Sequence, residues 1–184
     1  VFVHKTGRGA YKTPLLKLDI AIMRTFNIAV AALACVAVAH AMTYRATLDW
    51  KNENFGSTVV TAPGVRGTVA LTINNDANMT FTGMFKLDKI DNMTMAHIHY
   101  GAAKTNGPVA VWLWPLDSSK PSVQPLTGKK IEIRFSGSLA NSVVGAAAGN
   151  TTMFMEWLNA RNLYVNMHST QYPAGVTRGQ LTKV

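Results

Sequence analysis

The residues with the clearest chemical potential are two histidines, His97 and His99, in the segment Met95-Ala96-His97-Ile98-His99-Tyr100-Gly101. In an extended strand, side chains two positions apart project from the same face, so the two imidazoles would lie close together. Met95 continues that face, and Met93 does so if the strand extends back that far. Imidazole binds copper and zinc, and a thioether suits soft Cu(I). The spacing therefore predicts part of a metal site.

A third histidine, His168, closes the run Leu163-Tyr164-Val165-Asn166-Met167-His168, in which Tyr164 and Asn166 share its face. If the fold brings this run beside the His-x-His pair, three neutral imidazoles can hold copper or zinc with a fourth position open. The alternative is that these histidines only hydrogen-bond to backbone carbonyls or to one another. The predicted ligands are His97, His99 and His168, and the candidates for a further ligand or for supporting contacts are Met95, Tyr164, Asn166 and Arg178.

Arg178 and two tryptophans have two interpretations each. Arg178, next to Gly179, is either a buried guanidinium that pairs with an Asp or a backbone carbonyl near the histidines, or an exposed edge residue. Trp112 and Trp114 share one strand face, either in the core or as an exposed platform for a sugar or a partner. Large aromatic side chains are mostly buried, which favours the core. Gly107, between Asn106 and Pro108, indicates a turn in which glycine is free to take a positive φ.

The elements that must position these residues are short strands. From Tyr44 onward, β-rich runs alternate with Gly, Pro and Asn, a pattern typical of a sandwich or barrel. The alternation in residues 68–73, followed by a polar turn cluster, predicts a hairpin. The expected strands are near 43–50, 66–74, 79–87, 94–100, 108–114, 130–137, 163–168 and 178–183.

One segment departs from the strand pattern. Apolar Met153, Phe154, Trp157 and Leu158 recur with helical spacing after two threonines that can serve as N-cap. We therefore expect one short amphipathic helix near 152–160.

The N-terminal part has the pattern of a targeting segment. Residues 23–27 carry a positive charge, and residues 28–38 form a small-apolar run. That run is too short to cross a hydrocarbon core of ~30 Å but suits a signal peptide; the alternative is a membrane anchor or buried helix. Cleavage after Ala39 or after Ala41 would begin the mature chain at His40 or Met42. The prediction is an upstream, non-native segment 1–22, a signal peptide 23–41 and a domain 42–184.

The distribution of charged residues and of cysteine indicates which partners and which cross-links are expected. The net charge is +9, but residues 1–41 hold five of the 18 basic and one of the nine acidic residues, which leaves +5 for the domain. Its basic residues are scattered, so nucleic acid is not an expected partner. The single cysteine, Cys35, lies in the leader, so the mature chain has no disulfide. Sequons predict glycosylation at Asn78, Asn92 and Asn150. The hydrolase motif G-x-S-x-G is absent, and no paired carboxylates accompany the histidines.

Several blocks together resemble the CHRD domain, the module named after chordin. They are Tyr44-Arg45-Ala46-Thr47-Leu48, Ala96 to Gly101, Asn106 to Leu113, Leu163 to Ser169, Pro173-Ala174-Gly175 and Arg178-Gly179-Gln180-Leu181. The resemblance implies an extracellular β-sandwich module with no settled activity when it stands alone. The His-x-His strand is also similar to the copper strand of copper-zinc superoxide dismutases. Those enzymes use more histidines than this domain offers, so dismutase activity is not expected.

These observations give one expectation for fold and two for function. The fold expected is all-β, an antiparallel Greek-key sandwich or barrel of superoxide-dismutase-like or immunoglobulin-like type, with one short helix. The leading function is a secreted, non-enzymatic binding or structural module with an extracellular protein or matrix partner and no membrane span in its mature form. The alternative is a copper or zinc protein that uses His97, His99 and His168; a mature N-terminal His40 would offer a separate copper site.

Overall fold

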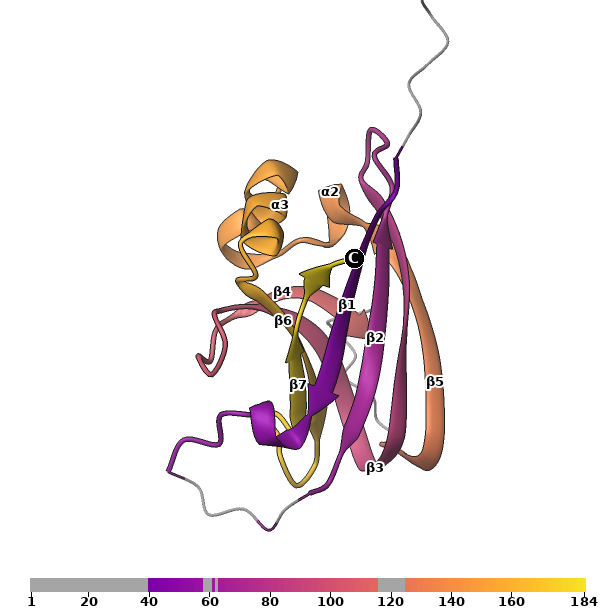
Figure 1. The fold of residues 1–184 in the computed structure, drawn as a ribbon, viewed down its shortest axis with the longest axis vertical. Coiled ribbons are helices and arrows are strands. Elements are labelled where there is room, and N and C mark those ends of the chain that lie inside the picture. Colours follow the sequence, from indigo (N-terminus) through magenta and orange to yellow (C-terminus); the bar gives the residue numbers. More distant parts are fainter. Residues whose placement is uncertain (1–39, 58–60, 62, 116–124) are drawn as a thin grey trace, which may run out of the picture. The chain divides into compact units, whose positions relative to one another are not determined.

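The computed structural model describes residues 40–57, 61, 63–115 and 125–184. Within these ranges the chain is a single antiparallel sheet accompanied by short helices (Figure 1). The predicted segment 1–22, nearly all of the predicted leader and Cys35 lie outside the described residues.

The sheet contains eight strands in the described part of the chain, and each strand pairs with its neighbours in antiparallel orientation. In chain order they are β1 (Met42–Asp49), β2 (Arg66–Ile73), β3 (Thr80–Tyr100), β4 (Val109–Trp114), β5 (Leu126–Ser138), β6 (Leu163–Ser169), β7 (Thr177–Gln180) and β8 (Thr182–Lys183). The all-β antiparallel prediction is confirmed.

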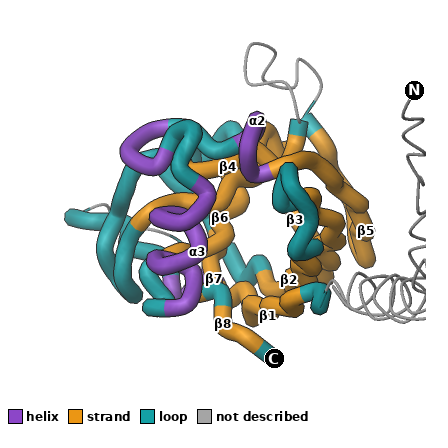
Figure 2. Tube along the Cα trace, turned by 90° about the horizontal axis from the view of Figure 1, so that it is seen from above, coloured by secondary structure: helices purple, strands orange, loops and turns teal. Residues whose placement is uncertain are grey.

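The sheet closes on itself like a barrel. Neighbouring strands follow the order β2-β1-β7-β6-β3, and β3 pairs again with β2. Strand β5 pairs with the first part of β3, and β4 pairs with its last part. Seen from above, the strands curve around a common interior (Figure 2). This closure leaves the two ends of β3 with different neighbours, so its last residues lie beside β6.

Strand β3 corrects one sequence prediction. Two separate strands, 79–87 and 94–100, were expected, but one strand of 21 residues covers both. Its register shifts between Ile90 and Met93, and again between Met93 and Met95. An extra residue at such a bulge bends a strand and changes which side chains face inward. The polar segment between the two expected strands therefore contains irregular strand rather than a loop.

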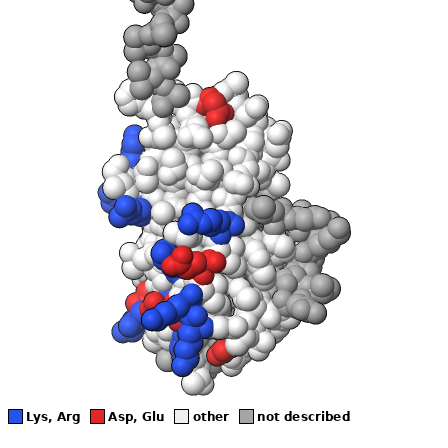
Figure 3. Space-filling view, turned by 90° about the vertical axis from the view of Figure 1, so that its right-hand side faces the viewer, with Lys and Arg blue, Asp and Glu red and all other residues white. Residues whose placement is uncertain are grey.

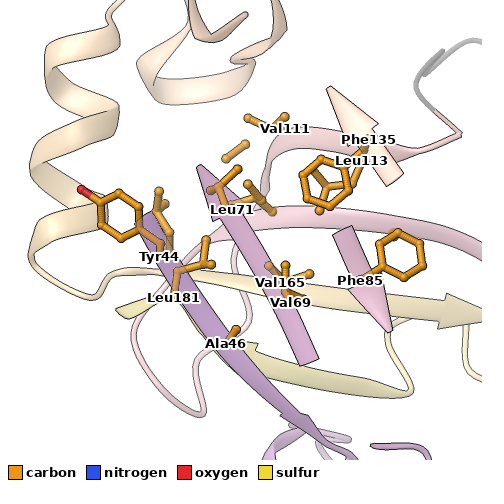
Figure 4. Close-up of a cluster of buried hydrophobic side chains, with 14 of the residues drawn as sticks. Tyr44, Ala46, Val69, Leu71, Phe85, Val111, Leu113, Phe135, Val165 and Leu181 are labelled. Atoms are coloured by element: carbon orange, nitrogen blue, oxygen red, sulfur yellow. The ribbon is translucent and has the colours of Figure 1, made fainter. Parts of the chain in front are cut away.

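The interior is filled by apolar side chains from the inner faces of β1 to β6 (Figure 4). Val69 and Leu71 of β2, Phe85 of β3 and Val165 of β6 are each at most 2% exposed. The alternation predicted for residues 68–73 is thus confirmed, because Val69, Leu71 and Ile73 are buried and the residues between them are not. The same alternation turns every second residue of β3 and β6 outward.

The expected helix is confirmed as α3 (Thr151–Asn159), which buries Phe154 and Leu158. Its N-cap is Asn150, whose side chain accepts a hydrogen bond from the Met153 N–H, and not one of the two threonines. The described residues contain three further turns of helix, which are α2 (Leu139–Ser142) and the 3-10 helices η1 (Trp50–Asn52) and η2 (Gly145–Ala147). No helix among the described residues has the length and apolar character needed to span a membrane.

Charged side chains of both signs are interspersed on the face shown in Figure 3. On the surface of the sheet, Lys86 of β3 pairs with Glu132 of β5 across the strands at 2.6 Å. The basic residues on this face therefore do not form a continuous patch.

Candidate metal centre

The pairing of β3 with β6 brings the three predicted histidines together. Met95 lies opposite His168, His97 opposite Asn166, and His99 opposite Tyr164. Directly opposed residues in an antiparallel pair project to the same face. Their neighbours Ile98 and Val165 lie in the core, so the histidines occupy the outer face of the barrel. This juxtaposition is what the sequence interpretation required.

The ring nitrogens approach one another closely. His97 Nδ1 is 3.0 Å from His168 Nε2, and His99 Nε2 is 3.3 Å from the same His168 atom. One ring nitrogen from each of the three residues lies within 4.8 Å of the others. The cluster is therefore of the size that a single ion can bridge.

Two backbone carbonyls fix the orientation of two rings. His99 Nδ1 lies 2.9 Å from the Gly107 oxygen, and His168 Nδ1 lies 3.0 Å from the Pro173 oxygen. A carbonyl oxygen only accepts, so both Nδ1 atoms carry the proton and donate it. Both Nε2 atoms then present lone pairs toward the cluster, which is how protein metal ligands are commonly oriented.

Burial keeps the three imidazoles neutral. His97, His99 and His168 are 3%, 7% and 4% exposed. Desolvation lowers the pKa of His97 to about 3 and that of His168 to about 4, with further lowering from the neighbouring imidazoles. Desolvation also lowers the pKa of His99, with a contribution from the charge of Arg178. Neutral rings with free lone pairs are the form that binds a metal.

Tyr164 and Arg178 support His99 and do not reach the cluster as ligands. The Tyr164 ring stacks on His99 at 5.1 Å and 11°, and its hydroxyl accepts a hydrogen bond from the Gly107 N–H. The Arg178 guanidinium lies over the Tyr164 ring, 4.5 Å from its centroid. It donates to the carbonyls of Asn52 and Thr105 and is 2% exposed. The buried interpretation of Arg178 is therefore correct.

Glu53 is a buried acidic residue beside Arg178 that the sequence analysis did not predict. Glu53 Oε1 is 3.9 Å from Arg178 Nε, and both side chains are at most 2% exposed. Burial raises the Glu53 pKa, and contacts with the Asn54 N–H and the Arg178 charge act against that rise. Asn166 is equally buried, between His97 and Arg178 in register. A lone glutamate in a loop carries no spacing signal, so nothing in the sequence pointed to it.

Met93 and Met95 lie on opposite sides of the sheet. Met93 lies in the hydrophobic core, because the bulge before Met95 reverses its direction, so its predicted place on the histidine face is wrong. Met95 is half-buried opposite His168 and remains a candidate ligand.

The tryptophan and glycine predictions need correction. Trp112 and Trp114 alternate with the core residues Val111 and Leu113 and are half-buried. Trp114 packs against the hydrophobic core, as predicted, whereas Trp112 is not part of it. The Trp112 ring meets His97 edge to face at 4.1 Å. Gly107 does not have a positive φ. It is required by close approach instead, because a Cβ there would overlap the Tyr100 carbonyl oxygen.

The three sequon asparagines, Asn78, Asn92 and Asn150, are exposed. Their positions are accessible to a glycan, which leaves glycosylation as a prediction.

Comparison with known protein families tests the resemblance to the CHRD domain. The model of the CHRD domain matches residues 44–181. The chain belongs to the CHRD family. The matched span of this CHRD chain runs from β1 to the residue before β8, so it contains the whole ring of strands and all three histidines. Searches of curated proteins and of solved structures found no match.

Proposed function

We propose that this CHRD chain is an extracellular, non-enzymatic module that binds one transition-metal ion, copper or zinc, through His97, His99 and His168. The family supports the extracellular module, and the side-chain geometry supports the metal site. Met95, opposite His168, is the candidate for a fourth ligand.

One observation carries the metal proposal. His99 Nε2 and His168 Nε2 lie 3.3 Å apart, and both are lone-pair atoms because their Nδ1 atoms donate to carbonyls. Two acceptors at this distance repel each other unless a cation lies between them. Two ligands at the usual Zn–N length in a tetrahedral arrangement are about 3.3–3.4 Å apart. The spacing therefore matches joint coordination better than mutual hydrogen bonding.

The rival interpretation is a purely structural cluster. His97 Nδ1 can donate to His168 Nε2 at 3.0 Å, which satisfies that contact without a metal. It does not resolve the repulsion between the lone pairs of His99 Nε2 and His168 Nε2. The buried His97 Nε2 has no hydrogen-bond partner in either interpretation when Nδ1 makes the contact. A metal-free domain would then act only through an extracellular protein or matrix partner.

Metal content tests the proposal. The purified protein is incubated with Zn(II), or with Cu(I) under a reductant, then desalted and analysed for metal by mass spectrometry. We expect one ion per chain, and a loss of at least about tenfold in affinity in His97→Ala and in His168→Ala. His40→Ala, which removes an exposed histidine outside the cluster, is the matched control.

Circular dichroism establishes that each variant retains the sheet. Binding that survives in folded His97→Ala and His168→Ala but disappears in His40→Ala would replace the cluster with an N-terminal site. Sub-stoichiometric metal in the wild type and in all three variants would contradict the metal site. The remaining proposal would then be a module that acts only by binding a partner.

A further inference from the structure

The donor set of the cluster carries no charge of its own. Within the described part of the chain, the group that can hold a metal consists of three histidines, with no aspartate, glutamate or cysteine among them. The rings are buried, so water screens an ion there poorly. An ion bound by neutral ligands keeps its full charge, and the cost of burying that charge rises steeply from a monovalent to a divalent ion.

The guanidinium of Arg178 places a permanent positive charge near the histidine cluster. Arg178, Tyr164 and His99 form a stack in which the guanidinium is 4.5 Å from the tyrosine ring, and that ring is 5.1 Å from the imidazole. Arginine stays protonated in proteins, so this charge is permanent. It repels any positive charge placed at His99, the third member of the stack. The same repulsion acts on a bound ion in proportion to its charge.

Glu53 offsets this charge only in part. Its carboxylate is 3.9 Å from Arg178 Nε and has one oxygen without a hydrogen-bond partner. Arg178 and Glu53 therefore act on a bound ion in opposite directions, and the effect of each grows with the charge of the ion.

Besides the buried side-chain oxygen of Asn166, which has no hydrogen-bond partner, this face offers one soft donor. Met95 lies opposite His168 and is half-buried, and thioether sulfur favours Cu(I) over Zn(II) and Cu(II). Zinc in a protein site takes four ligands, commonly completed by a carboxylate, a thiolate or a water. The rings themselves are at most 7% exposed, which restricts water as the fourth ligand.

We propose that the three-histidine cluster selects Cu(I) over the divalent ions Zn(II) and Cu(II), with Arg178 as the residue that sets the charge preference. This inference rests on the proposed function, because it assigns the metal at the same site. Arg178 is a positioning and electrostatic residue here and touches no metal.

Competition titrations test the selectivity. Cu(I) affinity is measured against a chromophoric Cu(I) chelator under anaerobic conditions, and Zn(II) affinity against a zinc indicator at the same pH. The wild-type protein should bind Cu(I) at least about a hundredfold more tightly than Zn(II). Comparable or tighter Zn(II) binding would overturn the selectivity and leave the proposed function intact. Absence of binding for both ions would refute the proposed function itself.

Two charge variants test the mechanism in opposite directions. At roughly 10 Å and an effective dielectric constant near 20, removal of one charge should change the Zn(II)-to-Cu(I) affinity ratio by on the order of tenfold. Arg178→Gln should raise that ratio, while Arg178→Lys, which keeps the charge, should move it much less. Glu53→Gln should lower the ratio, which keeps the test decisive if Arg178→Gln does not fold. An unchanged ratio in a folded Arg178→Gln or in Glu53→Gln would overturn the role assigned to this charge.

Discussion

Acidification should destabilise the metal-free protein through its buried histidines. His97 and His168 have folded pKa values of about 3 and about 4, against an ordinary value of 6.5. A lowered histidine pKa means that the unfolded chain binds more protons than the folded chain between the two values. The stability contributed by the neutral rings is therefore fully present above pH 6.5 and is lost as the pH falls toward 4 and then 3.

The magnitude follows from linkage. One pKa unit corresponds to about 1.4 kcal/mol. Between about pH 7.5 and about pH 4.5, each ring should therefore lower the free energy of unfolding by about 2.5 kcal/mol, and the two rings together by about 5 kcal/mol. The assay is urea unfolding followed by circular dichroism at both pH values, with a chelator present to remove metal. A double variant, His97→Asn with His168→Asn, should lose most of this dependence. The reasoning fails if wild type and double variant show the same change in unfolding free energy.

Three further outcomes are expected from single substitutions, each measured by urea unfolding. Gly107→Ala should destabilise the fold by at least about 2 kcal/mol, because its Cβ overlaps the Tyr100 carbonyl. It should also weaken metal binding by about tenfold or more, since the Gly107 oxygen orients His99. Phe85→Ala should cost about 3–5 kcal/mol as a fully buried aromatic, with metal affinity of the folded fraction retained. Asn150→Ala should cost about 1 kcal/mol through loss of the α3 N-cap and should remove one glycan from protein made by a glycosylating secretory host, as intact mass would show.

The strands and helix were accessible from the sequence because their signals are local. Alternation in β2 places Val69 and Leu71 in the core, and helical spacing places Phe154 and Leu158 there. The continuity of β3 was not accessible. Its polar middle resembles a loop, and only the bulges and the pairing with β5 keep it extended.

The candidate site also has features that the sequence predicts and features that it does not. The His-x-His spacing and the position of His168 predict the cluster, since pairing of β3 with β6 needs only the strand assignments. The atoms that orient the rings were hidden, because they are backbone oxygens of Gly107 and Pro173, which have no residue-type signature. The inward turn of Met93 depends on a bulge that periodicity cannot place.

The central claim is that one ion is shared by three imidazoles on the outer face of β3 and β6. A crystal structure of the protein loaded with Cu(I), with anomalous data at the copper edge, measures this directly. The account predicts a single strong peak about 2.0–2.1 Å from one nitrogen of each of His97, His99 and His168. A peak elsewhere, or a direct hydrogen bond between His97 and His168 with no copper between the rings, would contradict it.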